Sequence, residues 1–322
     1  MSGETIHATI GATSGAPVQI PGRLTWRSPA RGQLFECPVW CARTNALYWI
    51  DVADPSVHRH CFTDGAQARW NLPKPPGSIA LTAGTRLLIA MRGALASLDT
   101  ASGALDALDW HGARLVEDRF NDGVTDRQGN FWVGTMDRKL EQPLGRLYRF
   151  GVNLDAVATP IDARLSNGLC FSPDGSRLYL SKTFEREIHC FSVDPATGAL
   201  SGRRLLVSFD RTPGRPDGCT VAADGSLWSA SVGGGRIDRF DADGRPLGVL
   251  PLPTSHPTHC VFGGADMKTL FVATSRFGEE FAQEHKGDAE AGHMLGYRVD
   301  CTGLLPTPFA HLGRSPAEQG PP

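Results

Sequence analysis

Residues 216–228 read Pro-Asp-Gly-Cys-Thr-Val-Ala-Ala-Asp-Gly-Ser-Leu-Trp, and the same order of residue types recurs along the chain. A polar residue, Asp217, comes first, followed by a short apolar run, the turn Asp224-Gly225 and the large apolar pair Leu227-Trp228. The other pairs of this kind are Leu47-Tyr48, Leu87-Leu88, Phe131-Trp132, Leu178-Tyr179 and Leu270-Phe271. By subtraction of the first residue numbers, successive pairs lie 40, 44, 47, 49 and 43 residues apart. Spacings of this size indicate a chain built from six structural repeats.

Each repeat has the pattern of a small antiparallel sheet. After each apolar pair a second short strand runs into another turn, as in Ile237-Asp-Arg-Phe-Asp-Ala-Asp-Gly244. The 37 Gly and 23 Pro residues of this 322-residue chain favour turns and short strands over long helices, and no sustained helical period is present. We therefore predict an all-β fold, a six-bladed β-propeller of four-stranded antiparallel blades.

The ring of blades must close, because a single sheet buries its two faces only by stacking against neighbours. We expect Arg23-Leu-Thr-Trp26 to pair with the last blade, whose other strands come from residues 260–312. The propeller is expected to span residues 21–313 as one domain. Residues 1–20 and 314–322 are expected to be disordered tails.

The composition argues against several classes of partner. The 32 Lys and Arg against 34 Asp and Glu give a net charge of −2, which does not suggest binding to nucleic acid or to an anionic membrane. The sequence has no secretory leader pattern and no apolar run of membrane-spanning length, so a cytoplasmic location is expected. The eight scattered cysteines lack any C-x-x-C pair and are interpreted as buried free thiols rather than a disulfide framework or a zinc site. We expect a small-molecule partner, and a monomer or weak oligomer.

One polar residue stands at a similar place in every repeat, between 9 and 11 residues before the apolar pair: Glu36, Ser78, Asn121, Asn167, Asp217 and His259. In a propeller, equivalent positions of the innermost strands meet around the central channel. Two carboxylates gathered there repel each other unless a cation neutralises them. Carboxylate and amide oxygens suit Ca²⁺, Mg²⁺ or Mn²⁺ better than Zn²⁺. The alternative is that these residues hold channel waters or cap strand ends.

Several motifs, taken in order, resemble one known family. They are Glu36-Cys-Pro-Val-Trp40, Arg119-Phe-Asn-Asp-Gly123, Ser166-Asn-Gly168, Pro216-Asp-Gly218 and Gly233-Gly-Gly-Arg-Ile237. Over roughly residues 24–312 the chain is similar to the senescence marker protein/gluconolactonase/luciferin-regenerating enzyme family, which includes regucalcin and bacterial sugar lactonases. The resemblance implies a six-bladed propeller with one divalent metal ion at the channel mouth, whether Ca²⁺, Mn²⁺, Mg²⁺, Zn²⁺ or Fe²⁺.

The resemblance also implies roles for individual residues. The metal ligands would be Glu36, Asn167 and Asp217, with Asn121 beside the metal and Arg119 reaching substrate hydroxyls. Asp217 would also act as the general base. The implied function is a metal-dependent hydrolase that opens the ester of a sugar-acid lactone, a gluconolactonase-like aldonolactonase of carbohydrate catabolism.

Some residues depart from the family pattern. Phe35 and Cys37 flank Glu36, and strand alternation predicts that both point away from the channel. Val232 replaces a usual aromatic residue, which would widen the pocket. Asp122 is interpreted as capping the turn at Gly123.

Two further side chains are candidates for the pocket. Lys182 stands where related lactonases commonly have Asp; it either recognises an acidic or phosphorylated sugar or pairs with Glu185 or Glu187. His259 either touches substrate, with a pKa suited to proton transfer, or has a structural role.

Two other functions remain open at this point. One is a phosphotriesterase-like hydrolase on the same scaffold, which would prefer phosphotriesters to lactones. The other is a calcium-binding regulatory propeller without turnover, which would bind metal but hydrolyse no lactone.

Overall fold

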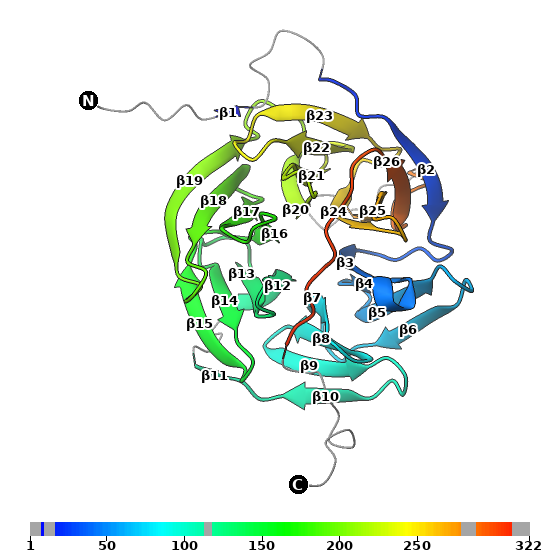
Figure 1. Ribbon diagram of the computed structural model, residues 1–322, viewed down its shortest axis with the longest axis vertical. Helices are drawn as coiled ribbons and strands as arrows, with labels where there is room; N and C mark the ends of the chain where they lie inside the picture. The colour runs from blue at the N-terminus through cyan, green and yellow to red at the C-terminus, as the bar shows by residue number, and fades with distance from the viewer. Residues whose placement is uncertain (1–7, 10–16, 113–117, 278–287, 311–322) are drawn as a thin grey trace.

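The protein is described by a computed structural model, which covers residues 8–9, 17–112, 118–277 and 288–310. These residues form six β-sheets arranged around a central axis (Figure 1). Each sheet has a core of four antiparallel strands, which confirms the predicted all-β, six-bladed β-propeller. Among the described residues there is no helix with the length and apolar character needed to cross a bilayer.

The strands are grouped here by blade, starting with the innermost strand. Blade 1 consists of β3 (Phe35–Cys41), β4 (Ala46–Asp51), β5 (Ser56–Cys61) and β6 (Gln67–Asn71). Blade 2 consists of β7 (Pro76–Leu81), β8 (Arg86–Met91), β9 (Ala94–Asp99) and β10 (Leu105–Leu108). Blade 3 consists of β12 (Asp118–Thr125), β13 (Phe131–Asp137), β14 (Arg146–Phe150) and β15 (Asp155–Pro160). Blade 4 consists of β16 (Ser166–Phe171), β17 (Arg177–Lys182), β18 (Glu187–Val193) and β19 (Leu200–Ser208). Blade 5 consists of β20 (Arg215–Val221), β21 (Leu227–Val232), β22 (Arg236–Phe240) and β23 (Pro246–Pro251). Blade 6 consists of β24 (Pro257–Gly263), β25 (Thr269–Thr274), β26 (Leu295–Val299) and β2 (Gly22–Arg27). The remaining elements are β1 (Ala8–Thr9), the 3-10 helix η1 (Ala42–Thr44) and β11 (His111–Gly112).

The ring closes as predicted, because the N-terminal strand β2 is the outer strand of the last blade. It runs antiparallel to β26, with Gly22 opposite Val299 and Arg27 opposite Leu295. Trp26 also packs edge-on against Phe271 of the same blade, with ring centroids 5.7 Å apart. Closure therefore links the two ends of the propeller through both backbone and aromatic contacts.

The N-terminal segment also pairs with blades where it is described. Ala8–Thr9 lies parallel to the end of β19, and the backbone of Ile20 bonds to Val249 of β23. The expected C-terminal tail, 314–322, lies outside the described residues, as do residues 1–7 and 10–16.

The six large apolar pairs of the sequence lie in the second strand of each blade and fill the space between blades. Leu47, Phe131 and Leu270 are fully buried. Blades 1 and 6 meet where the Trp40 ring stacks on Phe271, with centroids 5.6 Å apart. Burying a side chain of this size contributes about 1.5–3 kcal/mol. The blades rather than any bound ion therefore supply the core, and they hold the inner strands in a fixed ring.

The inner strands β3, β7, β12, β16, β20 and β24 share an irregularity that decides which side chains face the channel. Each shifts its register against the second strand of its blade near the same point, between Glu36 and Val39 in β3, for example, and between Asn167 and Cys170 in β16. Such a bulge adds a residue and breaks the simple alternation of side chains. The left-handed backbone of Cys37, with φ 43°, is part of this bulge.

The bulge overturns one prediction from alternation. Phe35 points away from the channel as expected and packs edge-on against Trp49 at 5.6 Å. Cys37 does not: its Sγ lies 3.4 Å from Oδ1 of Asp122, on the inner strand of blade 3. The prediction that Cys37 faces away from the channel is therefore wrong, because the extra residue turns its side chain inward.

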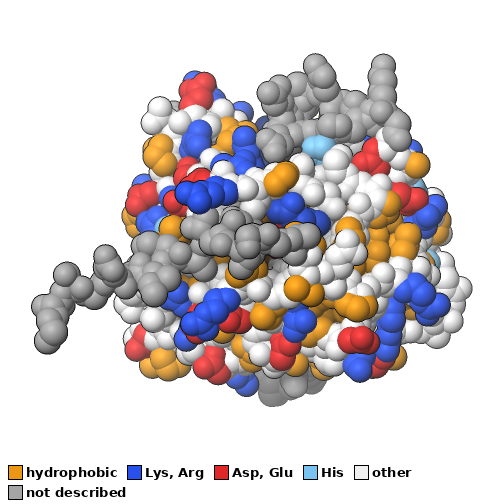
Figure 2. Space-filling model, turned by 90° about the horizontal axis from the view of Figure 1, so that it is seen from above, with side chains coloured by type: hydrophobic (Ala, Val, Ile, Leu, Met, Phe, Trp, Pro, Cys, Tyr) orange, Lys and Arg blue, Asp and Glu red, His pale blue; other side chains and the backbone are white. Residues whose placement is uncertain are grey.

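A C-terminal strap, residues 301–310, crosses one end of the channel (Figure 1). Gly303 forms a bridge to Ala222 of blade 5, and Phe309 forms one to Thr82 of blade 2. The backbone N–H of Ala310 donates to the carbonyl of Gly129 in blade 3. The outer surface seen in Figure 2 carries Lys and Arg side chains interspersed with Asp and Glu, without a field of one sign.

Candidate metal centre

Five of the predicted site residues line one cavity of about 60 Å³ at the mouth of the channel where the inner strands begin. They are Glu36 of β3, Arg119 and Asn121 of β12, Asn167 of β16 and Asp217 of β20. Residues distant in sequence meet here because four blades present the same bulge position to the axis. Val232 also lines this cavity, as do the apolar side chains of Leu165, Phe184 and Phe277.

Blades 2 and 6 differ from the predicted register by one residue. Their bulges also add one residue, and the register shifts between Pro76 and Ser78 in β7 and between Pro257 and His259 in β24. Thr258, rather than His259, lines the cavity. Ser78 is fully buried, and its hydroxyl donates to the carbonyl of Gly123 at 3.3 Å. Sequence spacing alone could not separate these neighbours, because the offsets vary by one or two residues from blade to blade.

Lys182 is buried and is not among the residues that line this cavity. It lies opposite Glu187 in the ladder between β17 and β18. Within the described part of the chain, neither Glu185 nor Glu187 forms an ion pair with it. Glu185 pairs with Arg164 at 3.3 Å, and Glu187 contacts His189 at 2.8 Å.

The two carboxylates of the cavity, Glu36 (half-buried) and Asp217 (buried), lie where a negative charge is unfavourable. Burial raises the pKa of Glu36 well above its ordinary value, and the negative charge of Asp217 raises it further. Burial likewise raises the pKa of Asp217, with a contribution from the charge of Asp122. Oδ1 of Asp217 is buried and accepts no hydrogen bond from the described residues. A buried carboxylate oxygen without a hydrogen-bond donor is suited to bind a cation.

Hydrogen bonds fix the orientation of the two amides. Nδ2 of Asn167 donates to Oγ1 of Thr183 at 2.9 Å, and that hydroxyl donates to the carbonyl of Pro216 at 2.9 Å. Nδ2 of Asn121 donates to the carbonyl of Ser166 at 3.0 Å and also to Oδ1 of Asn167. Nδ2 of Asn167 is therefore engaged with Thr183, while its Oδ1 accepts from Asn121 and has a second lone pair that could bind a cation.

Arg119 brings a positive charge to the same wall. Its Nε lies 2.9 Å from Sδ of Met136. Burial lowers the pKa of Arg119, and the negative charge of Glu36 opposes that shift. A guanidinium remains protonated in either case. It can therefore donate hydrogen bonds to oxygens of a bound molecule.

A second polar cluster lies deeper in the channel and was not recognised in the sequence. One ligand atom each from Cys37, Asp122 and His259 lies within 4.8 Å of the other two, and all three residues are buried. Oδ1 of Asp122 accepts from the N–H of Gly123 at 2.7 Å, but Gly123 lies within strand β12, so the prediction that Asp122 caps a turn is wrong. Burial acts to lower the pKa of His259, but the charge and hydrogen bond of Asp122 raise it overall. The cluster has side chains that could hold a metal ion.

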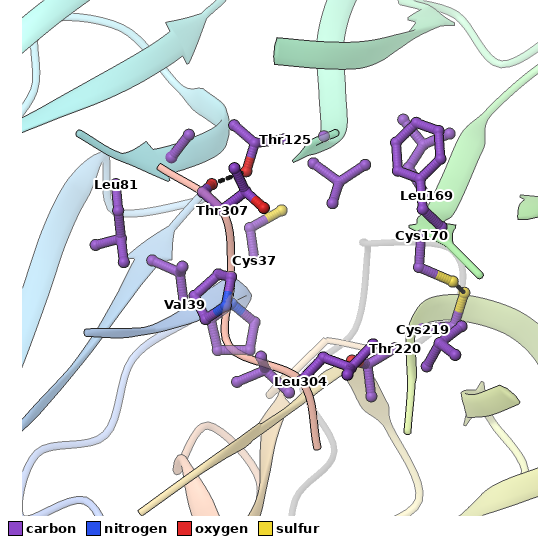
Figure 3. A pocket seen from close by; sticks show the side chains of 18 of the residues that line it. Cys37, Val39, Leu81, Thr125, Leu169, Cys170, Cys219, Thr220, Leu304 and Thr307 are labelled. Carbon is purple, nitrogen blue, oxygen red and sulfur yellow. Dashed lines mark hydrogen bonds between the residues drawn. The ribbon is translucent and has the colours of Figure 1, made fainter. Parts of the chain in front are cut away.

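The larger channel cavity, about 340 Å³, opens toward the opposite end, under the C-terminal strap. Cys37 and His259 line it, together with Cys170 and Cys219 of blades 4 and 5. Figure 3 shows the cysteines on its wall and Leu304 and Thr307 of the strap across it. All eight cysteines of the chain are buried free thiols.

Known proteins are similar to this chain in sequence and in fold. The family model described as SMP-30/Gluconolactonase/LRE-like region matches residues 34–276. A 6-deoxy-6-sulfogluconolactonase from Pseudomonas putida is 36% identical over 286 residues, which cover 86% of this chain and 95% of that protein. An L-arabinolactonase from Azospirillum brasilense is 34% identical over 269 residues, covering 80% of this chain and 86% of that protein.

Solved structures agree with this relationship. A calcium-binding protein, regucalcin, from Agrobacterium tumefaciens superposes with a TM-score of 0.81 at 25% identity, covering 91% of this chain and 99% of that one. The matched family region includes Glu36, Arg119, Asn121, Asn167 and Asp217. The resemblance inferred from the motifs is confirmed, and the chain belongs to the SMP-30/gluconolactonase/LRE-like family.

Proposed function

We propose that this protein is a divalent-metal-dependent hydrolase that opens the ester ring of a sugar-acid lactone, a gluconolactonase-like enzyme. The observation that carries the proposal is the convergence of Glu36, Asn167 and Asp217 on one small cavity, where Oδ1 of Asp217 is buried without a hydrogen-bond partner. Relatives named as lactonases of several sugar acids support the reaction class.

The donor set fits a hard divalent cation. Two carboxylates and one amide oxygen from blades 1, 4 and 5 would hold it, with Glu36, Asn167 and Asp217 as ligands. Bound there, the ion would supply Lewis-acid polarisation of the lactone carbonyl. It would also neutralise the repulsion between the carboxylates, which raises the pKa of Glu36.

The remaining chemistry falls to side chains of the same cavity. In lactone hydrolysis water adds to the carbonyl carbon, the bond from that carbon to the ring oxygen breaks, and the ring oxygen gains a proton. Asp217 would take the proton from water and return it to the ring oxygen, as a general base and then acid. Arg119 and the amide of Asn121 would hold substrate hydroxyls and stabilise the developing oxyanion.

The direct test is a panel of aldonolactones followed with a pH indicator, since ring opening yields an acid. Chelator-stripped protein should lose hydrolysis, and added Ca²⁺, Mg²⁺, Mn²⁺ or Zn²⁺ should restore it. Turnover that is unchanged after complete metal removal would contradict the proposal. Phosphotriester hydrolysis with a higher kcat/KM would point instead to the other hydrolase class.

A calcium-binding protein without turnover is the second candidate, favoured by the all-oxygen donor set and by relatives named regucalcin. It predicts tight Ca²⁺ binding at the same residues and no hydrolysis of any lactone in the panel. The positive charge of Arg119 in the cavity favours the enzyme, because a guanidinium beside a metal site has a use when an anionic or hydroxylated substrate enters.

A further inference from the structure

Cys37, Asp122 and His259 come from three different blades and meet inside the channel, below the Glu36/Asn167/Asp217 centre. They are 5%, 2% and 7% exposed, so the cluster is shielded from solvent. None of them has a part in the proposed lactone hydrolysis. A thiol, a carboxylate and an imidazole gathered at one buried point are the ligand types of a transition-metal site.

The separations agree with tetrahedral coordination. Typical Zn–S, Zn–N and Zn–O bonds of about 2.3, 2.0 and 2.0 Å place sulfur and oxygen roughly 3.5 Å apart, and nitrogen and oxygen roughly 3.3 Å apart, at tetrahedral angles. Here Sγ of Cys37 lies 3.4 Å from Oδ1 of Asp122, and Nε2 of His259 lies 3.3 Å from the same oxygen. The sulfur and the nitrogen lie within 4.8 Å of each other.

The surrounding hydrogen bonds orient each ligand. Nδ1 of His259 lies 3.1 Å from the carbonyl of Cys260, and a carbonyl only accepts, so Nδ1 carries the proton. Nε2 then faces a carboxylate oxygen, a contact that needs a proton or a metal ion between the two atoms. Oδ2 of Asp122 accepts from the N–H of Leu169 at 2.9 Å, which fixes the carboxylate. Hydrogen bonds that orient a carboxylate and an imidazole in this way are typical of metal ligands.

Cys37 adopts an unusual backbone to reach the cluster. Its φ of 43° lies in the left-handed region, which a residue with a Cβ rarely occupies. Without a metal its thiol can donate to the carbonyl of Gly77 at 3.2 Å or to Asp122. Strained positions of this kind concentrate at functional sites.

We propose that Cys37, Asp122 and His259 form a second metal site, which binds Zn²⁺ or a similar transition metal through a thiolate and is distinct from the all-oxygen centre above it. Cys37 lines the larger cavity (Figure 3). His259 lines it as well, so water from that side can complete the coordination. The ion would link blades 1, 3 and 6 across the axis. This site does not depend on the proposed lactonase activity.

Cobalt substitution tests the site, because a thiolate ligand gives Co²⁺ an intense near-ultraviolet charge-transfer band. Stripped protein is first loaded with excess Ca²⁺ to occupy the all-oxygen centre and is then titrated with Co²⁺. The band should saturate at one equivalent. It should be lost in Cys37→Ser and retained in Cys41→Ser, a buried cysteine of the same strand that is outside the cluster. A folded wild-type protein without the band, or a band that survives Cys37→Ser, would overturn the proposal.

A second measurement needs no variant. X-ray absorption of wild-type protein with one equivalent of Zn²⁺, again in excess Ca²⁺, should give one sulfur at about 2.3 Å and otherwise nitrogen and oxygen neighbours. A zinc shell without sulfur, or with several sulfurs, would refute the site. Lactone hydrolysis is measured on the same samples, so a missing thiolate site and a missing lactonase activity are recorded separately.

Discussion

Replacing Asp217 by asparagine should stabilise the metal-free protein while abolishing metal binding and catalysis. The carboxylate is buried, its Oδ1 has no hydrogen-bond partner among the described residues, and its charge raises the pKa of Glu36. Asparagine has nearly the same shape and still leaves a polar atom unpaired, but it removes the buried charge and its repulsion with Glu36. We expect a gain of about 1–3 kcal/mol, which raises Tm by roughly 1.5–4.5 °C in a chain of this length at an unfolding entropy of about 2.1 cal/mol/K per residue.

The effect should depend on pH in a defined direction. Burial raises the pKa of Asp217 in the folded protein. A carboxyl group of this kind favours folding below its unfolded pKa, and that contribution is lost as the pH rises toward the folded pKa. The stabilising effect of Asp217→Asn should therefore be small near pH 4 and larger at pH 8. The assay is thermal and urea unfolding of chelator-treated protein at both pH values.

A matched control separates this effect from a general loss of buried charge. Asp126 is also buried, but its carboxylate accepts from Nε1 of Trp132 at 2.8 Å and from the N–H of Asn130 at 2.9 Å. Asp126→Asn should lower the free energy of unfolding, whereas Asp217→Asn should raise it.

Activity of Asp217→Asn should fall at least about a hundredfold, which is the lower end of the contribution of a general base. An Asp217→Asn protein that is less stable without metal, or that keeps near-normal activity, would refute the reasoning.

Three further changes have defined outcomes. Arg119→Ala should raise KM for lactones at least about tenfold, because one charged hydrogen bond to the substrate is lost. Calorimetry should show that the variant still binds Ca²⁺. An unchanged KM would show that Arg119 does not contact the substrate. Gly168→Ala should cost roughly 3 kcal/mol in urea unfolding and weaken metal binding, because Gly168 has φ 57° and a Cβ there would lie 2.2 Å from Oγ of Ser181 and 2.6 Å from the carbonyl of Asp217. Burial lowers the pKa of His58 to about 4, so its neutral form contributes stability that is lost as the pH falls from 6.5 toward 4. Between pH 7 and pH 5 that loss is about 2 kcal/mol, and His58→Phe should show a correspondingly smaller loss in the same urea experiment; an equal loss in both proteins would exclude His58 as the cause.

The fold could be predicted from the sequence because its signal repeats six times. Pairs such as Phe131-Trp132 and Leu270-Phe271 recur at similar spacing, and each pair must be buried between blades. Strand β2 precedes the first of the six repeats, and we therefore predicted that it pairs with the last blade, as it does with β26. Redundant signals of this kind tolerate errors of a residue or two.

The inside of the channel is less predictable, because a single extra residue reverses the direction of a side chain. The bulge in β3 brings Cys37 inward beside Glu36, although alternation places it outside. In β24 it is Thr258 that lines the cavity with Glu36, and the next residue, His259, lies in the deeper cluster. The left-handed backbone at Cys37 could not be predicted from the sequence, because the residue usually found in that conformation is glycine. Asp122 could be read only as a turn cap, because its partners come from other blades.

The most direct test of the metal centre is a crystal structure of the protein grown with Mn²⁺, with anomalous scattering used to locate the ion. We expect a peak in the cavity of about 60 Å³ at the channel mouth, in direct contact with side-chain oxygens of Glu36, Asn167 and Asp217. Asn121 and Arg119 should lie on the adjacent wall. An ion bound elsewhere, with these three side chains turned away from one another and the cavity empty of metal, would contradict it.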